Sequence, residues 1–144
     1  MVSFSEGIRL FFQRYTDFSG RSQRSEYWWP MLMNVLVMMV LSGLLVSSGI
    51  DLETGAMSSV AMIGAGLIAI YSLVVFIPTI AVFVRRLHDL GLSGWFALLI
   101  FVVSMVPGIG LLASIAQIVV GCLRGNEGAN KYGESPIVIN PATK

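Results

Sequence analysis

The sequence predicts an all-α integral membrane protein, a bundle of three to four membrane helices with an N-terminal amphipathic interfacial helix. Its 144 residues are 56% hydrophobic and only 12% charged, whereas soluble domains usually carry about 25% charged residues. Three stretches contain no Lys, Arg, Asp or Glu: residues 27–50, 54–84 and 90–123. At about 1.5 Å per residue, each is long enough to cross about 30 Å of hydrocarbon as a helix. We therefore expect a single membrane domain that covers residues 1–144.

Residues 3–16 are predicted to form the amphipathic helix. Ser3 and Glu6 make a capping box, in which the Ser3 side chain accepts a hydrogen bond from the Glu6 amide. Apolar side chains then recur at helical spacing on one face. They are Phe4, Ile8, Phe11, Phe12 and Tyr15. We expect this face to lie in the membrane interface or on the helix bundle, and docking on a soluble partner is the alternative.

Span one is predicted over residues 27–46, after a polar linker in which Gly20 permits a sharp turn. The span opens with aromatic residues typical of the membrane interface. They are Tyr27, Trp28 and Trp29. The segment lacks the cleavage site of a secretory signal, so we expect a retained span. Its only strongly polar residue is Asn34, which could hydrogen-bond across helices.

Span two is predicted over residues 57–84, after a short acidic loop with Asp51 and Glu53. Small residues share one face of this span and would let helices approach closely. They are Ala61, Gly64, Ala65 and Ala69. Packing within the monomer is the simpler interpretation of this face, and a homo-oligomer seam is the alternative.

The third apolar run, from Trp95 to Leu123, is too long for one straight crossing and is interrupted by Pro107 and Gly108. It is either a hairpin of helices 95–106 and 111–123 or one kinked span, followed by a polar tail over residues 124–144. Basic residues concentrate on the cytoplasmic side of inner-membrane proteins, and four arginines precede span one. We therefore expect a multi-pass protein with a cytoplasmic N-terminus. The hairpin would put all nine basic residues on that side, and we favour it because each half is short for a full crossing.

The sequence Arg85-Arg86-Leu87-His88-Asp89 is the only charged cluster between Glu53 and Arg124. We expect a short loop here, at the membrane face that also holds the linker residues Arg21, Arg24 and Glu26. Two arrangements are open. The arginines could form an ion-pair network with the carboxylates, since the guanidinium fork matches a carboxylate. Alternatively, an unpaired arginine pair could bind an anion such as a phospholipid head group.

Other functional classes have weaker support in the sequence. His88 is the only histidine and could transfer protons, but no nucleophile with a matched base stands out, so we predict no catalytic residues. One His and the distant Cys122 do not make a metal site, and we expect no cofactor. The net charge of +1 gives no reason to expect a nucleic-acid partner. No acidic residue lies within a span, unlike in typical proton-coupled transporters, and Gln117 is the most polar residue of the third run.

Four motifs, in order, resemble the domain-of-unknown-function 805 family of bacterial inner-membrane proteins. Residues 18–29 match F-x-G-R-x-x-R-x-E-[YF]-W-W, and residues 85–95 match R-R-L-H-D-x-x-x-S-[GA]-W. Residues 107–110 match P-x-x-G, and residues 128–136 match G-x-N-x-[YF]-G-x-x-P. The resemblance implies a protein of the bacterial plasma membrane and no particular reaction. It adds Asn130 to the candidate site residues.

We therefore expect a small non-enzymatic inner-membrane module whose Arg/His/Asp cluster binds an anionic lipid head group or a partner protein. The candidate residues, which bind a ligand or form a structural ion-pair cluster, are Arg21, Arg24, Glu26, Arg85, Arg86, His88, Asp89 and Asn130. A small transporter or channel subunit, oligomeric through span two, is the alternative. A lipid-modifying enzyme that uses His88 as acid and base is the third hypothesis.

Overall fold

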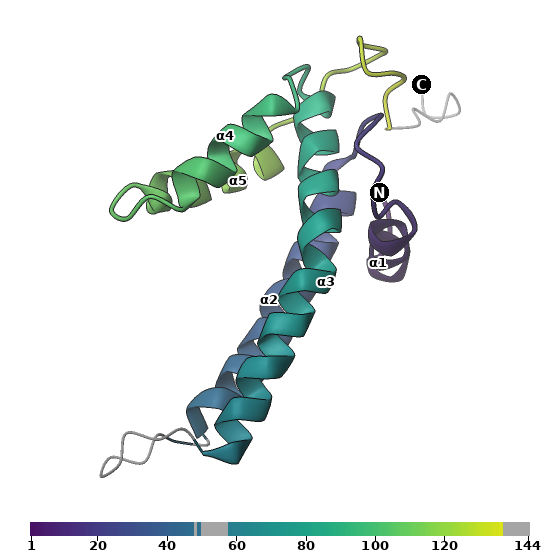
Figure 1. The fold of residues 1–144 in the computed structure, drawn as a ribbon. Coiled ribbons are helices and arrows are strands. Elements are labelled where there is room, and N and C mark those ends of the chain that lie inside the picture. Colours follow the sequence, from purple (N-terminus) through teal and green to yellow (C-terminus); the bar gives the residue numbers. More distant parts are fainter. Residues whose placement is uncertain (48, 50–57, 137–144) are drawn as a thin grey trace. The chain divides into compact units, whose positions relative to one another are not determined.

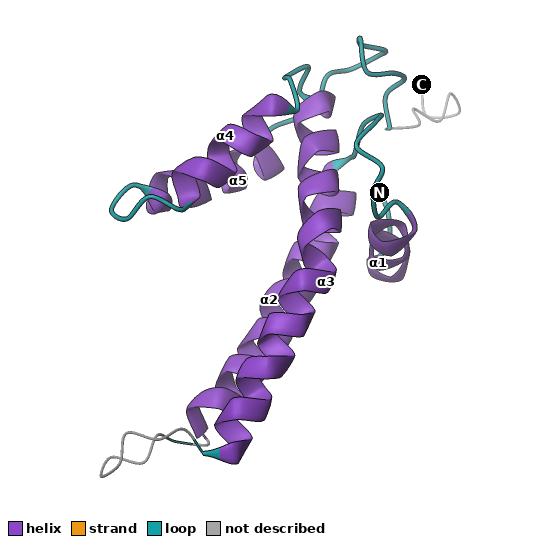
Figure 2. Ribbon diagram, viewed as in Figure 1, coloured by secondary structure: helices purple, strands orange, loops and turns teal. Residues whose placement is uncertain are grey.

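The computed structural model describes residues 1–47, 49 and 58–136. These residues form five α-helices and no β-strand (Figure 2), so the all-α prediction is confirmed. The acidic loop with Asp51 and Glu53 and the end of the tail lie outside the described residues. The chain divides into two compact units, one of residues 31–77 and the other of residues 1–30 together with the chain from Pro78 onward.

The unit of residues 31–77 contains most of α2 (Arg24–Ser47) and α3 (Ser59–Asp89), which run side by side (Figure 1). Both helices are long and apolar enough to cross a membrane. A Cβ atom added to Gly64 would lie 3.5 Å from Leu45 Cα, so the small residue permits a close approach. The Tyr71 hydroxyl donates to Asn34 Oδ1 at 2.6 Å. The expected interhelical hydrogen bond of Asn34 is therefore present.

The second unit begins with α1 (Phe4–Gln13), whose first turn is capped as expected by Ser3, with Oγ 3.3 Å from the Glu6 amide nitrogen. Its aromatic face packs on the start of α2. The Phe4 and Trp29 rings meet edge to face at 5.6 Å, and the Trp29 indole donates to the Val2 carbonyl. Part of the aromatic face of α1 is thus used within the protein.

The charged cluster at residues 85–89 is not the loop that the sequence analysis expected, because α3 continues through it to Asp89. Basic side chains at this position suit the negative end of the helix dipole. The helix then ends in a Schellman motif: the Leu92 amide bonds to the Leu87 carbonyl, and Gly91 adopts φ +76°. The charged side chains are therefore held on the final turns of a helix.

The third apolar run forms two separate helices, α4 (Trp95–Ser104) and α5 (Gly110–Cys122), which pack against each other. Their lengths of 10 and 13 residues correspond to about 15 and 20 Å, less than the roughly 30 Å hydrocarbon core. The start of α2 contacts α5 through Tyr27, whose hydroxyl donates to the Gln117 carbonyl at 3.3 Å. Gln117 therefore bonds across helices through its backbone carbonyl.

Candidate functional site

Asp89 is the carboxylate at the centre of the charged cluster. It lies 2.9 Å from Arg21 Nη2 and also pairs with Arg86, and all three side chains are at most 2% exposed. Arg86 donates as well to the carbonyls of Val120 and Leu123 at the end of α5. The linker, α3 and α5 thus meet around one carboxylate.

Glu26 is the second buried carboxylate and lies in the first turn of α2. It accepts from the Ser22 hydroxyl at 2.8 Å and from Arg14 at 3.3 Å. Arg85 is completely buried and lies 3.5 Å from Glu26, and it also donates to Ser22 Oγ at 3.0 Å. Glu26 is therefore the counter-ion of two guanidiniums, as Asp89 is.

Asp17 is a third carboxylate, in the linker between α1 and α2. Burial raises its pKa, but hydrogen bonds from Ser19 and Arg14 together with the charge of Arg14 outweigh this effect and lower the pKa to about 2. The Asp17 backbone carbonyl accepts from Arg85. The linker is therefore tied to α3 through its backbone as well as through its side chains.

The polar tail packs against the same cluster. Arg21 donates to three tail carbonyls, those of Asn126, Gly128 and Gly133. Asn130 donates to the His88 carbonyl at 2.9 Å. Gly125 lies so close to Asp89 that an added Cβ would be 1.9 Å from Oδ2. The tail residues up to Gly133 therefore lie at the same end of α3 as the linker.

The structure brings seven of the eight candidate residues into one bonded cluster, and Arg24 lies outside its bonds, near enough to Arg86 for the two charges to repel. Arg24 is exposed, and within the described part of the chain it forms no ion pair. Sequence reasoning missed Arg14, Asp17 and Ser22. Their only signal was their position at the end of the amphipathic helix, for Arg14, and in the polar linker, for Asp17 and Ser22.

His88 is placed by a ring stack and not by a carboxylate. Its ring lies 3.7 Å from that of Tyr132 at an interplanar angle of 7°, and Nδ1 is 3.2 Å from the Gly20 carbonyl. Lys131 Nζ lies 4.9 Å from the Tyr132 ring centroid. Among the described residues, no carboxylate forms an ion pair with the His88 ring.

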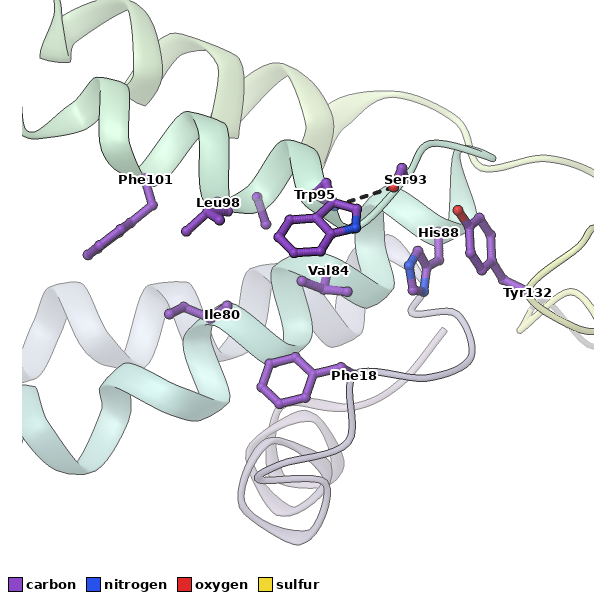
Figure 3. Close-up of a pocket in the computed structure, with 11 residues that line it drawn as sticks. Phe18, Ile80, Val84, His88, Ser93, Trp95, Leu98, Phe101 and Tyr132 are labelled. Carbon is purple, nitrogen blue, oxygen red and sulfur yellow. Dashed lines mark hydrogen bonds between the residues drawn. The ribbon is translucent and has the colours of Figure 1, made fainter.

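Two cavities adjoin this stack. One, of about 500 Å³, lies between the end of α3 and the start of α4 and is mostly apolar, with Ile80, Val84 and Leu98 in its wall (Figure 3). The other, of about 660 Å³, is lined by linker residues and by Lys131. Both contain Phe18, His88 and Tyr132 in their walls. Among the described residues, no group of three His, Cys, Asp or Glu could hold a metal ion.

A family model described as "Protein of unknown function (DUF805)" matches residues 15–134. Inner membrane protein YhaI of Escherichia coli K12 is 36% identical over 124 residues, which cover 86% of this chain and 89% of YhaI. Inner membrane protein YhaH of the same strain is 38% identical over 125 residues, 86% of this chain and 90% of YhaH. Uncharacterized protein YiiR is 30% identical over 136 residues. No solved structure matches the chain significantly.

Proposed function

The chain belongs to the DUF805 family of proteins of unknown function, and on this premise we propose that it is a non-enzymatic membrane module that binds an anionic lipid head group. The family resemblance predicted from the four motifs is confirmed. The names of its relatives support the bacterial inner membrane as its location. In the proposal, the N-terminus and the charged cluster face the cytoplasm, where basic residues concentrate.

The observation that carries the proposal is an excess of positive charge around the end of α3. Among the described residues, four guanidiniums pair there with three carboxylates, those of Asp17, Glu26 and Asp89. Arg24 and Lys131 are exposed, and neither forms an ion pair within the described residues. Basic side chains at the cytoplasmic face attract anionic lipids by about 1 kcal/mol each.

In this proposal Arg85 and Arg86 do not bind the anion, although the sequence left open an unpaired arginine pair that would do so. Both are buried, and both donate to backbone carbonyls as well as pairing with a carboxylate. Removing one partner from such a pair is strongly destabilising. We therefore assign Arg85 and Arg86 to the scaffold and Arg24 and Lys131 to the head group.

The test compares lipids retained by the full-length protein in native mass spectrometry, with phosphatidylglycerol and phosphatidylcholine supplied equally. We expect the wild type to prefer phosphatidylglycerol. The double variant Arg24→Ala and Lys131→Ala should lose roughly 30-fold of this preference, because two contacts of about 1 kcal/mol are removed.

The matched control is the double variant Arg9→Ala and Arg124→Ala, which removes the same charge from arginines that are exposed but paired with Glu6 and Glu127. Its lipid preference should stay near that of the wild type. The proposal is wrong if the wild type retains both lipids equally, or if the two double variants behave alike.

A further inference from the structure

We infer that one hydrocarbon chain of a bilayer lipid inserts into the apolar cavity between α3 and α4, while its anionic head group lies in the adjoining cavity that Lys131 lines. This inference rests on the proposed function, to which it adds a site for the chain and a single amphiphile as the ligand class.

The first cavity has the size and lining of a site for a hydrocarbon chain. Its volume of about 500 Å³ lies within the range of roughly 300–1,000 Å³ that is usual for small-ligand sites. Ile80 and Val84 of α3 face Leu98 and Phe101 of α4 across it (Figure 3). Cavities with such apolar linings do not hold water well and favour apolar occupants.

The approach of α4 to the end of α3 depends on Gly94. A Cβ atom at this position would lie 2.9 Å from Val84 Cγ1 and 3.1 Å from His88 Nε2. Gly94 thus lets the start of α4 lie against α3, and Ala97, one turn later, lines the cavity without filling it. The small residues keep the two helices close at one end of the cavity and leave space in its interior.

The second cavity supplies the charged residues of the site, Asp17 and Lys131. Lys131 lines it and has no carboxylate partner within the described residues. Asp17 also lines it, but its oxygens accept hydrogen bonds from Arg14 and from Ser19. The positive charge that remains available is therefore that of Lys131, which complements a phosphate.

The two cavities are joined at the His88–Tyr132 stack, because Phe18, His88 and Tyr132 line both. Trp95 lines the apolar cavity and is 76% exposed. Tryptophan is enriched at the membrane–water interface, so its position places the cavity wall at the depth where a lipid head group meets its chains. A lipid that enters from the surrounding bilayer would place its hydrocarbon chain in the apolar cavity and its head group beside Lys131.

The experiment uses myristoyl lysophosphatidylglycerol, myristoyl lysophosphatidylcholine and glycerol 3-phosphate as probes, with retention by the full-length protein measured by native mass spectrometry. We expect the wild type to retain the lysophosphatidylglycerol in preference to the other two. Leu98→Trp should reduce this retention about tenfold or more, because the indole occupies space that several methylenes would fill.

Leu99→Trp is the matched control, since Leu99 is a neighbour of similar exposure that does not line the cavity. It should bind as the wild type does, and both variants should keep the wild-type melting temperature because both sites are half exposed. Equal retention by Leu98→Trp and Leu99→Trp would overturn the inference. So would binding of glycerol 3-phosphate as tight as that of the lysolipid.

The outcomes separate this inference from the proposed function. If Leu98→Trp binds the lysolipid normally while the Arg24 and Lys131 double variant loses its preference for phosphatidylglycerol, the chain site is wrong and the head-group proposal stands. If Leu98→Trp loses both lysolipids, and the wild type does not distinguish them, the chain site stands and the anionic head group is wrong.

Discussion

At the scale of single residues, Asp89 is a buried counter-ion shared by two arginines. Its carboxylate balances the charges of Arg21 and Arg86, and all three groups are buried. A buried charge is tolerated only when it is paired and hydrogen-bonded. The stability of this end of α3 should therefore depend on the negative charge of Asp89.

Asp89→Asn preserves the size of the side chain and removes its charge. We expect it to lower the free energy of unfolding by about 3–5 kcal/mol, because two buried guanidiniums lose their counter-ion. The measurement is thermal unfolding in detergent, followed by circular dichroism.

Glu127→Gln is the control for Asp89→Asn. Glu127 is 65% exposed and pairs with Arg124, which is 74% exposed, so the loss should be no more than about 1 kcal/mol. If both variants unfold at the same temperature, Asp89 does not have the role assigned to it.

Residue types alone predicted which charges gather at one place, but not how they pair. The motifs named Arg21, Arg86 and Asp89, which do meet in the structure. They also named Arg24, which is exposed. A sequence shows that arginines exceed carboxylates but not which arginine is left over, because that depends on which of them the fold buries beside a carboxylate.

At the scale of elements, apolar runs and breaks in the sequence predicted the helices, but they did not predict where α3 ends. Residues 85–89 were predicted to form a loop because charged residues usually lie outside the hydrocarbon core. Helix geometry tolerates charge when caps and partners exist, and here Gly91 provides the cap. The glycine was visible in the sequence, but apart from Asp89 the partners of Arg85 and Arg86 lie 34 or more residues away.

The contact between α5 and the start of α2 depends on Gly121. An added Cβ atom would lie 2.6 Å from Tyr27 Cε1 and 2.9 Å from Trp28 Cζ2. We expect Gly121→Ala to cost about 1–3 kcal/mol, because the rings or the helix must shift. Unfolding in sodium dodecyl sulfate, followed by circular dichroism, measures the difference.

Gly43→Ala is the control, because Gly43 lies in α2 with nothing within 4 Å of the added atom. It should be neutral or stabilising by up to about 1 kcal/mol, as alanine favours helix. A loss for Gly43→Ala as large as that for Gly121→Ala would mean that the packing of α5 on α2 is not the cause.

At the scale of the whole molecule, the linker and the tail are bonded to the same end of α3. We therefore predict that both termini lie in the cytoplasm, with α4 and α5 forming a hairpin that enters and leaves by one face. Fusion of green fluorescent protein to the C-terminus should fluoresce, since it folds only in the cytoplasm.

Alkaline phosphatase gives the complementary readout, because it is active only in the periplasm. The enzyme should be inactive when fused to the C-terminus and active when inserted between α2 and α3. Activity at the C-terminus would place the tail opposite the linker and contradict the bonds of Arg21 to the tail.

The bonds between Arg86 and the end of α5 also set an order of events during synthesis. Arg86 leaves the ribosome before Val120 and Leu123, whose carbonyls it needs; the delay is a few seconds at roughly 5–20 residues per second. Throughout that time the Arg86 guanidinium has Asp89 and the Ser22 carbonyl as partners, and its remaining donors have to be hydrated or held by the insertion machinery. A chain truncated before α5 would leave those donors without acceptors. The burial of Arg86 is therefore completed only after α5 has been made.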